Sequence, residues 1–283
     1  MHQRYATSPD QIKGADTTEL RDRFLVQDLF VPGEVNVTYT HHDRVVLGGA
    51  VPAGDAPLPL PTYDEIRSDF FLEHREIGIV NVGGAGTVTT DGEVHELPKG
   101  ACLYVGRGVR EVVFANADTA SGEESGEPAA FYLFSAPAHT TYPTVLTLPG
   151  EGTVRELGDQ VTSNRRSLNQ YIHENGVKSC QIVMGVTQLH PGSMWNTMPA
   201  HTHARRTECY LYFDLPADAR VVHLCGEPTE TRHLLVGDRE AVISPSWSVH
   251  SGVGTAAYAF VWAMAGENQS FDDMDGFPVA AMR

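Results

Sequence analysis

Cysteine is scarce in this 283-residue chain, and no Cys-x-x-Cys pair occurs. The four cysteines are widely separated, at Cys102, Cys180, Cys209 and Cys225, so the sequence contains no redox or metal motif of that type. Because most of them stand in otherwise apolar, strand-like surroundings, we expect small buried hydrophobic residues in a reducing cytoplasm.

Positive charge and long apolar segments are also lacking. The chain has 20 Lys and Arg against 36 Asp and Glu, a formal net charge of -16. Nucleic-acid binding depends on clustered Lys and Arg, so we expect no nucleic-acid partner. No apolar run approaches membrane-spanning length and the chain begins with polar residues, so we expect no membrane segment, no signal peptide and a cytoplasmic location. An anionic substrate would need local positive charge from a metal or a few arginines.

Short strand-like runs, punctuated by Gly, Pro and Asp, fill most of the sequence after residue 32. The run Thr90-Asp91-Gly92-Glu93 is typical of a hairpin turn. This spacing predicts a mainly β fold, an antiparallel sandwich or barrel. Before residue 32 we predict two short helices, one starting near Ser8 and one near Thr17, the second capped by Asp16 or Thr17.

Changes of composition divide the chain into four predicted segments. Residues 1–32 form an N-terminal helical arm, and residues 33–140 form a first lobe without metal. Residues 141–179, which contain Pro143 and Pro149, form a linker. Residues 180–283 form a second lobe, which binds metal and ends in a tail after Asn268. Residues 118–128, rich in Gly, Glu and Ser, are predicted to be a surface loop.

A weak internal repeat supports two lobes of one shape. Residues 97–110 resemble residues 235–250, and residues 76–82 can be aligned with residues 208–214, which places Glu76 against Glu208. The first lobe lacks the histidines of the second, so we expect it to have the same shape and no metal.

Two histidines and a glutamate form the most informative motif. Side chains alternate faces along a strand, so His201 and His203 point the same way. A short turn through residues 204–207 brings Glu208 back beside them, with Tyr210 on the same face of the returning strand. Two imidazoles and a carboxylate are ligands that a borderline divalent metal prefers.

A fourth ligand is expected from a later strand. The segment from Gly237 to His250 contains a Gly turn, an apolar strand and a Pro-bounded turn that presents His250. One histidine alone is more often a hydrogen-bonded surface residue. The combination of His201, His203, Glu208 and His250 favours a metal site.

These motifs resemble the two sequence motifs of the cupin superfamily. Longer runs are similar to the 5-keto-4-deoxyuronate isomerase family (5-dehydro-4-deoxy-D-glucuronate isomerases) over nearly the whole chain. The runs are Phe30-Val-Pro-Gly-Glu-Val-Asn, Tyr104-Val-Gly-Arg-Gly, Trp195-Asn-Thr-Met-Pro-Ala-His-Thr-His, Ile243-Ser-Pro-Ser-Trp-Ser-Val-His and Trp262-Ala-Met-Ala-Gly-Glu-Asn.

The resemblance implies a two-lobed cupin that assembles as a homohexamer and holds one Zn²⁺ per chain through His201, His203, Glu208 and His250. It implies an aldose–ketose isomerisation in pectin and uronate breakdown, from 5-dehydro-4-deoxy-D-glucuronate to 3-deoxy-D-glycero-2,5-hexodiulosonate. A Lewis-acid metal would stabilise the enediolate oxyanion. A purely structural zinc is the alternative role for such a site.

Candidates for proton transfer and substrate binding are less specific. Glu208 could combine metal ligation with proton transfer, and Tyr210 and Tyr258 could donate to a substrate oxygen, although aromatic packing is the simpler role of each tyrosine. Residues that could pair with the uronate carboxylate are Arg165, Arg166, Arg205, Arg206 and, as a weaker candidate, Lys178.

Three other functions fit the same motifs. One is 5-deoxy-glucuronate isomerase of inositol breakdown, which a substrate panel would distinguish. Another is an iron-dependent cupin dioxygenase, which metal analysis and oxygen uptake would reveal. The third is a sugar-binding cupin without catalysis, which would bind its ligand without turnover.

Overall fold

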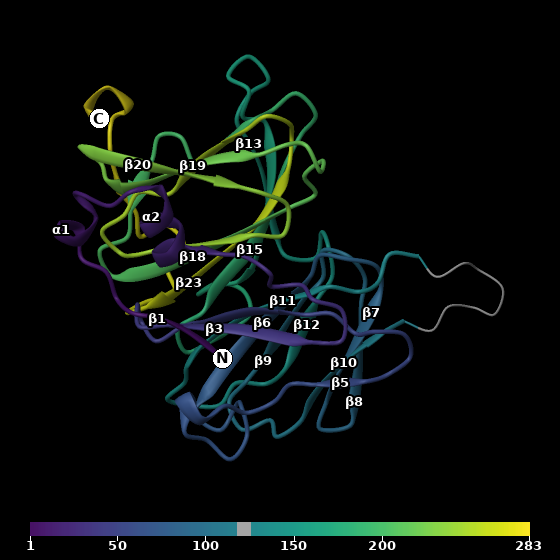
Figure 1. Cartoon of the computed structure of the whole chain (residues 1–283). Coiled ribbons are helices and arrows are strands. Elements are labelled where there is room, and N and C mark those ends of the chain that lie inside the picture. Colours follow the sequence, from purple (N-terminus) through teal and green to yellow (C-terminus); the bar gives the residue numbers. More distant parts are fainter. Residues whose placement is uncertain (118–125) are drawn as a thin grey trace.

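The computed structural model describes residues 1–117 and 126–283, and it consists of two β lobes joined face to face (Figure 1). Most of the surface loop expected at 118–128 lies outside the described residues. Within the described part, no helix is long and apolar enough to cross a membrane.

The N-terminal arm contains the two predicted helices, and short strands flank them. Helix α1 (Pro9–Ile12) follows Ser8, and α2 (Thr17–Phe24) is capped by the Asp16 carboxylate, which accepts a 2.9 Å hydrogen bond from the Glu19 backbone N–H. Before and after them lie β1 (His2–Arg4) and β2 (Leu25–Val26). Figure 1 shows β1 beside the first lobe and α1 and α2 against the second.

The first lobe is a seven-stranded sheet packed on a four-stranded sheet. In spatial order the larger sheet contains β1, β3 (Val35–Thr40), β4 (Val46–Ala50), β11 (Phe131–Pro137), β6 (Arg75–Asn81), β9 (Cys102–Val105) and β12 (Val145–Thr147). The smaller contains β5 (Leu58–Pro59), β10 (Val112–Asn116), β7 (Gly86–Thr90) and β8 (Glu93–Leu97), and a short 3-10 helix, η1, spans Asp64–Ile66. Strands β7 and β8 form the predicted hairpin: Asp91 and Gly92 between them have φ values of 47° and 89°, as a tight turn of this kind requires.

The second lobe repeats this arrangement. Its larger sheet contains β13 (Thr153–Leu157), β14 (Arg166–Ile172), β15 (Val183–Leu189), β23 (Ala259–Gly266), β18 (Arg206–Phe213), β21 (Ala241–Ser244) and β2. Its smaller sheet contains β16 (Trp195–Asn196), β22 (Ser251–Gly254), β19 (Val221–Glu227) and β20 (Glu230–Val236). The chain then adds β24 (Asp275–Gly276), which pairs with β17 (His201–Thr202), and the 3-10 helix η2 (Val279–Ala281).

The predicted fold class is confirmed, because both lobes are built from mainly antiparallel sheets packed as sandwiches. The sheets do not close into barrels. One apolar core lies inside each lobe. A third core lies between the two larger sheets, where residues such as Val80 and Tyr132 of the first lobe pack near Leu211 and Val261 of the second.

Two predicted segment boundaries are corrected by the strand pairing. Residues 141–179 are not a separate linker, because β12 completes the first lobe while β13 and β14 belong to the second. The N-terminal arm is not only helical, because its strand β2 pairs with β21. Strand β2 is thus the last strand of the second lobe's larger sheet, the position that β12 has in the first lobe. Backbone groups at a sheet edge can pair with whichever segment reaches them, and composition does not reveal that choice.

The internal repeat is real, but its predicted register is wrong by one residue. Ile77 pairs with Val105 in the first lobe as Glu208 pairs with Ser244 in the second. Ile77 faces its own lobe's interior, whereas Glu76 faces the other lobe. A shift of one residue reverses the face of every side chain in a strand. The first lobe therefore has an isoleucine where the second has its glutamate.

Candidate metal centre

The turn predicted between the paired histidines and Glu208 brings the three side chains together. The short strand β17 holds His201, residues 203–205 turn the chain, and β18 returns with Glu208. On β18, Glu208 and Tyr210 face the interior of the second lobe, while Cys209 and Leu211 face the core between the lobes. The predicted alternation is therefore correct, and it aims the carboxylate into the lobe.

His250 joins these three residues from the turn that precedes β22. His201 Nε2 lies 3.1 Å from His203 Nε2 and 3.0 Å from His250 Nε2. Glu208 Oε2 lies 2.9 Å from His203 Nε2 and 2.8 Å from His250 Nε2. The four donor atoms all lie within 4.8 Å of one another. The structure thus places the four sequence-predicted ligands in one cluster.

The geometry of this cluster fits a divalent cation. A tetrahedral zinc site with bonds of about 2.0–2.1 Å has ligand atoms roughly 3.3 Å apart, close to the 2.8–3.1 Å separations found here. His203, Glu208 and His250 are buried, and His201 is partly buried. Three imidazole nitrogens and one carboxylate oxygen could therefore hold a metal ion.

Electrostatics favour the protonation states that bind a cation. Burial, reinforced by the neighbouring His250 and His203, lowers the pKa of His201 to about 2. Burial alone would raise the pKa of Glu208, but the adjacent His250 and His203 hold it well below its ordinary value. A neutral imidazole and an ionised carboxylate are the ligand forms that coordinate metals.

The orientation of His203 is set by a residue from the C-terminal tail. His203 Nδ1 lies 2.7 Å from the carbonyl oxygen of Asp273, and because a carbonyl can only accept, Nδ1 carries the proton and Nε2 keeps its lone pair toward the cluster. Arg206 Nη2 donates to the same carbonyl at 2.8 Å. Arg206 Nη2 also lies 3.2 Å from His203 Nδ1, because both N–H groups donate to the same Asp273 carbonyl oxygen.

A cavity of about 250 Å³ opens beside the cluster. His201, His203, Glu208 and Tyr210 line it together with apolar side chains, among them Trp262. Tyr210 Oη lies 3.0 Å from Thr197 Oγ1, another lining residue. A largely apolar pocket with few polar groups is the usual form of a small-molecule site.

The structure separates the predicted substrate-binding residues. Arg166 lines the cavity. Arg165 is exposed and does not line it, and Lys178 bonds to the Glu174 carbonyl away from it. Arg206 is fully buried, and its guanidinium donates to backbone carbonyls behind His203. A side chain enclosed in this way positions the site and cannot grip a substrate carboxylate.

The two predicted catalytic tyrosines also differ. Tyr210 lines the cavity, whereas Tyr258 does not. The Tyr258 hydroxyl accepts a 2.8 Å hydrogen bond from Asn196 Nδ2 and donates to the Gly252 carbonyl at 3.3 Å. The structure therefore does not bring Tyr258 to the cavity.

The C-terminal tail also contributes to the site, which the residue patterns did not predict. Phe271 and Met274 line the cavity, and the Asp273 carbonyl bonds to His203. A backbone carbonyl has no sequence signature, so residue types alone could not reveal this contact. Phe271 and Met274, two apolar residues beside the aspartates at 272, 273 and 275, were the only available signal.

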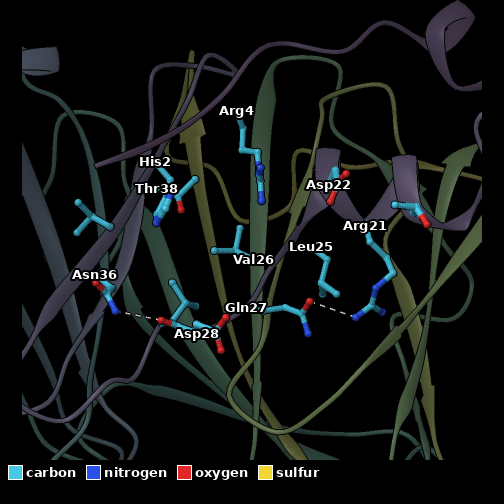
Figure 2. Close-up of a pocket in the computed structure, with 13 residues that line it drawn as sticks. His2, Arg4, Arg21, Asp22, Leu25, Val26, Gln27, Asp28, Asn36 and Thr38 are labelled. Atoms are coloured by element: carbon cyan, nitrogen blue, oxygen red, sulfur yellow. Dashed lines mark hydrogen bonds between the residues drawn. The ribbon is translucent and has the colours of Figure 1, made fainter.

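A larger cavity, of about 360 Å³, lies at the junction of the lobes (Figure 2). Arg4 of β1 points into it, and Arg21 of α2 donates to Gln27 at its rim. Asp22 and Asp28 also line it, so the formal charges of its arginines and aspartates cancel. The described part of the chain has one group of three or more potential metal ligands, and that group is in the other cavity.

Comparison with solved structures identifies the fold. An IolB-like protein from Salmonella typhimurium aligns with a TM-score of 0.69 at 15% identity, covering 90% of this chain and 96% of that one. An oxalate decarboxylase from Lactobacillus farciminis aligns with a TM-score of 0.56 at 10% identity, covering 82% and 79%. At these identities the likeness shows the two-lobed β fold alone.

Sequence comparison shows the family. A protein from Kineococcus radiotolerans is 72% identical over 283 residues and one from Bacillus pumilus is 54% identical, each covering all of both chains. Both carry the name 4-deoxy-L-threo-5-hexosulose-uronate ketol-isomerase. The model of the KduI/IolB family matches residues 24–276. This chain therefore belongs to the KduI/IolB family.

Proposed function

We propose that this chain is a 4-deoxy-L-threo-5-hexosulose-uronate ketol-isomerase, which interconverts 5-dehydro-4-deoxy-D-glucuronate and 3-deoxy-D-glycero-2,5-hexodiulosonate. The observation that carries the proposal is one cavity that combines a divalent-metal donor set with a single arginine, Arg166. Full-length relatives that bear this enzyme's name support the same substrate.

The proposed cofactor is one Zn²⁺ per chain, held by His201, His203, Glu208 and His250. The three-nitrogen, one-oxygen donor set is one that zinc accepts, and zinc can expand its coordination to admit a substrate oxygen. When bound, such an ion supplies Lewis-acid stabilisation for the oxyanion that develops as C1 and C2 exchange carbonyl and hydroxyl.

Arg166 is the proposed partner of the substrate carboxylate. Among the described residues its side chain makes one hydrogen bond, from Nη1 to the Asn164 carbonyl at 2.8 Å. Burial lowers the pKa of Arg166, yet a guanidinium stays charged in proteins. Its other N–H groups can therefore meet a carboxylate in bidentate geometry. In a partly dehydrated cavity this contact would hold the far end of a uronate.

Tyr210 is the proposed hydrogen-bond donor to a substrate oxygen. Burial raises its pKa well above the ordinary value, so the phenol stays protonated and donates without acting as a base. With Thr197 Oγ1 donating to the phenol oxygen 3.0 Å away, the Tyr210 proton is free for a substrate oxygen. A donor aimed at developing negative charge lowers the activation free energy.

Glu208 is assigned the role of ligand in this proposal. Its Oε2 faces both His203 and His250, and its depressed pKa makes it a weak base. General bases work best with a pKa near the operating pH. The ligand role therefore explains its environment better than proton transfer does.

The decisive test is turnover of the named substrate. Purified protein is incubated with the unsaturated uronate monomer, which opens to the 5-keto acid, and C1 carbonyl loss is followed with and without a chelator. We expect isomerisation that stops on metal removal and returns when Zn²⁺ is added. Full activity in metal-free protein would reject the metal's catalytic role.

The alternative functions predict different results when other substrates, bound metal and oxygen uptake are measured as well. Faster conversion of 5-deoxy-glucuronate than of the 5-keto acid would favour the inositol-pathway isomerase. Bound iron with oxygen uptake would favour a dioxygenase, and binding without turnover would favour a sugar-binding protein. The ketol-isomerase is preferred because the full-length relatives from several bacteria carry that name.

We also propose a cytoplasmic homohexamer that acts in pectin and uronate breakdown. The acidic composition, with a net charge of -16, suits a freely diffusing protein. Light scattering coupled to size-exclusion chromatography would give the mass of the assembly, and a mass other than six chains would contradict the hexamer.

A further inference from the structure

The C-terminal tail, residues 267–283, lies against the proposed metal centre. Strand β24 pairs with β17, with Gly276 opposite His201. The Phe277 backbone N–H donates to the Ala200 carbonyl at 3.1 Å, which extends this contact by one residue. The tail therefore holds the backbone of one proposed ligand, His201.

The same tail also contacts the side chain of a second proposed ligand, His203. The Asp273 carbonyl accepts the 2.7 Å hydrogen bond from His203 Nδ1. Ring N–H partners of this kind fix the tautomer and orientation of metal-binding histidines. Two of the four ligands thus depend on where the tail lies.

Charged side chains fasten the tail at this point. Arg205 Nε donates to both carboxylate oxygens of Asp273, at 2.8 and 2.9 Å, and Arg205 Nη2 lies 3.0 Å from Asp275 Oδ2. Asn268 Nδ2 donates to Asp273 Oδ2 at 2.7 Å. The Asp273 side chain makes these contacts while its carbonyl, a separate group, faces His203.

The tail also closes one wall of the cavity. Phe271 and Met274 line it, and the Phe271 ring packs 5.2 Å from the Trp262 ring between centroids. Met274 is 37% exposed, so this part of the wall lies at the surface of the molecule. Undocking the tail would open the cavity to water and release His201 and His203 together.

We propose that the tail is a strap whose docking and metal binding are coupled, with Arg205 and Asp273 as its positioning residues. The docked strap orients His201 and His203 for the ion, and the bound ion in turn holds the strap in place. Such coupling is reciprocal, because each event changes the other's equilibrium by the same factor. The inference rests on the proposed metal and not on the identity of the sugar substrate.

Asp273→Asn and Arg205→Gln test the strap, because neither removes the carbonyl that contacts His203. The matched control is Asp272→Asn: its side chain is 76% exposed and makes only a 3.9 Å ion pair with Arg155. Zn²⁺ affinity is measured by competition with a chromogenic chelator. We expect about 10- to 100-fold weaker binding in both strap variants, the range seen when partners of ligating histidines are lost, and wild-type affinity in the control.

Limited chymotrypsin digestion supplies the reciprocal readout, since Phe271 is a cleavage site within the tail, whereas the bond between Phe277 and Pro278 resists the protease. Zn²⁺ should slow tail cleavage in the wild-type protein, and chelator should speed it. The strap variants should be cleaved faster at equal Zn²⁺ concentration. Unfolding midpoints of the chelated proteins identify any variant whose fold is lost. Because Arg205→Gln and Asp273→Asn remove opposite partners of one contact, the second variant still tests the strap if the first fails to fold.

Each outcome decides the matter. Wild-type Zn²⁺ affinity in both strap variants, or tail cleavage that ignores Zn²⁺, would overturn the coupling while leaving the isomerase proposal intact. Wild-type protein that binds no Zn²⁺ would overturn the coupling and the proposed cofactor together. Weaker binding in the strap variants with active wild-type enzyme would support both, and weaker binding in an enzyme inactive on the uronate would reject only the substrate.

Discussion

Glu76 of the first lobe lies 2.7 Å from the backbone nitrogen of Gln181, which leads into the second lobe. The same carboxylate accepts hydrogen bonds from the Cys180 and Ile182 backbone N–H groups and from the Tyr104 hydroxyl, at 2.7, 3.0 and 2.7 Å. Glu76 is fully buried. One side chain on the face opposite to that of Ile77 thus joins the two lobes.

Removal of this carboxylate should destabilise the protein. Glu76→Ala leaves three backbone N–H groups and a phenol without their buried acceptor, and each unpaired group is costly. We expect the free energy of unfolding to fall by about 3–5 kcal/mol, measured by denaturant titration. Glu93→Ala, at an exposed hairpin position, is the control, and equal losses in the two variants would show that Glu76 does not join the lobes.

His203→Ala should remove bound metal and isomerase activity together. The substitution deletes one donor nitrogen and leaves Glu208 without the partner 2.9 Å away. Metal content per chain, measured by elemental analysis, should fall well below that of the wild type. His233→Ala changes an exposed histidine of β20 and should retain both properties. Turnover by a metal-free His203→Ala protein would contradict the metal assignment.

Arg166→Gln should weaken substrate binding more than catalysis. Charge-assisted hydrogen bonds contribute about 1.5–3 kcal/mol, so KM should rise roughly 10- to 100-fold while kcat changes less. Arg165→Gln alters the neighbouring exposed arginine, which does not line the cavity, and should leave KM unchanged. Steady-state kinetics separate the two constants. An unchanged KM in Arg166→Gln would exclude this carboxylate contact.

Tyr210→Phe should lower kcat by about 10²-fold, the usual effect of deleting a donor to a developing oxyanion. Tyr258→Phe is the matched comparison, because its hydroxyl bonds to Asn196 and does not reach the cavity. We expect nearly normal kcat in that variant. Equal loss of kcat in both proteins would point to packing and not to hydrogen-bond donation.

His223 should make the protein sensitive to mild acid. Burial lowers the pKa of His223 to about 3, below the ordinary value of about 6.5. Between these values the unfolded chain binds a proton that the folded chain does not, so stability falls as pH falls. The loss from this group is up to about 1.4 kcal/mol per pH unit.

The variant His223→Gln isolates that effect. Glutamine does not titrate and still offers an acceptor to the Tyr212 hydroxyl, which lies 2.8 Å from His223 Nδ1. Unfolding free energies are compared at pH 7 and pH 5 with chelator present, which removes the contribution of metal binding. The wild type should lose more stability than the variant. Parallel pH profiles would show that His223 does not cause the acid sensitivity.

Local pattern was sufficient for much of this protein. Alternation along β18 predicted that Glu208 and Tyr210 share a face, and capping chemistry predicted α2 behind Asp16. The Gly and Pro punctuation near 237–250 predicted how His250 is presented. These features depend on a few consecutive residues, whose side-chain directions follow from the period of the strand or helix.

The sequence could not predict which distant segments pair with each other. Nothing local distinguishes β2 as an edge strand of the second lobe, or decides that Ile77 and not Glu76 takes the place of Glu208. The same limit hid Tyr258's distance from the cavity and Arg206's burial. The candidate arginines look equivalent in the sequence, and only the packing of the folded chain shows that Arg166 lines the cavity.

The sequence by itself determined the donor set, because imidazoles and a carboxylate at strand spacing must converge once the strands form. The tertiary structure decided what surrounds that set: Arg166 at the cavity wall, Arg206 behind His203, and the Asp273 carbonyl on its ring. The physical reason is the separation along the sequence over which each effect acts. Side-chain alternation acts over two residues, whereas the tail lies 70 residues from His203 in sequence and meets it only through the completed fold.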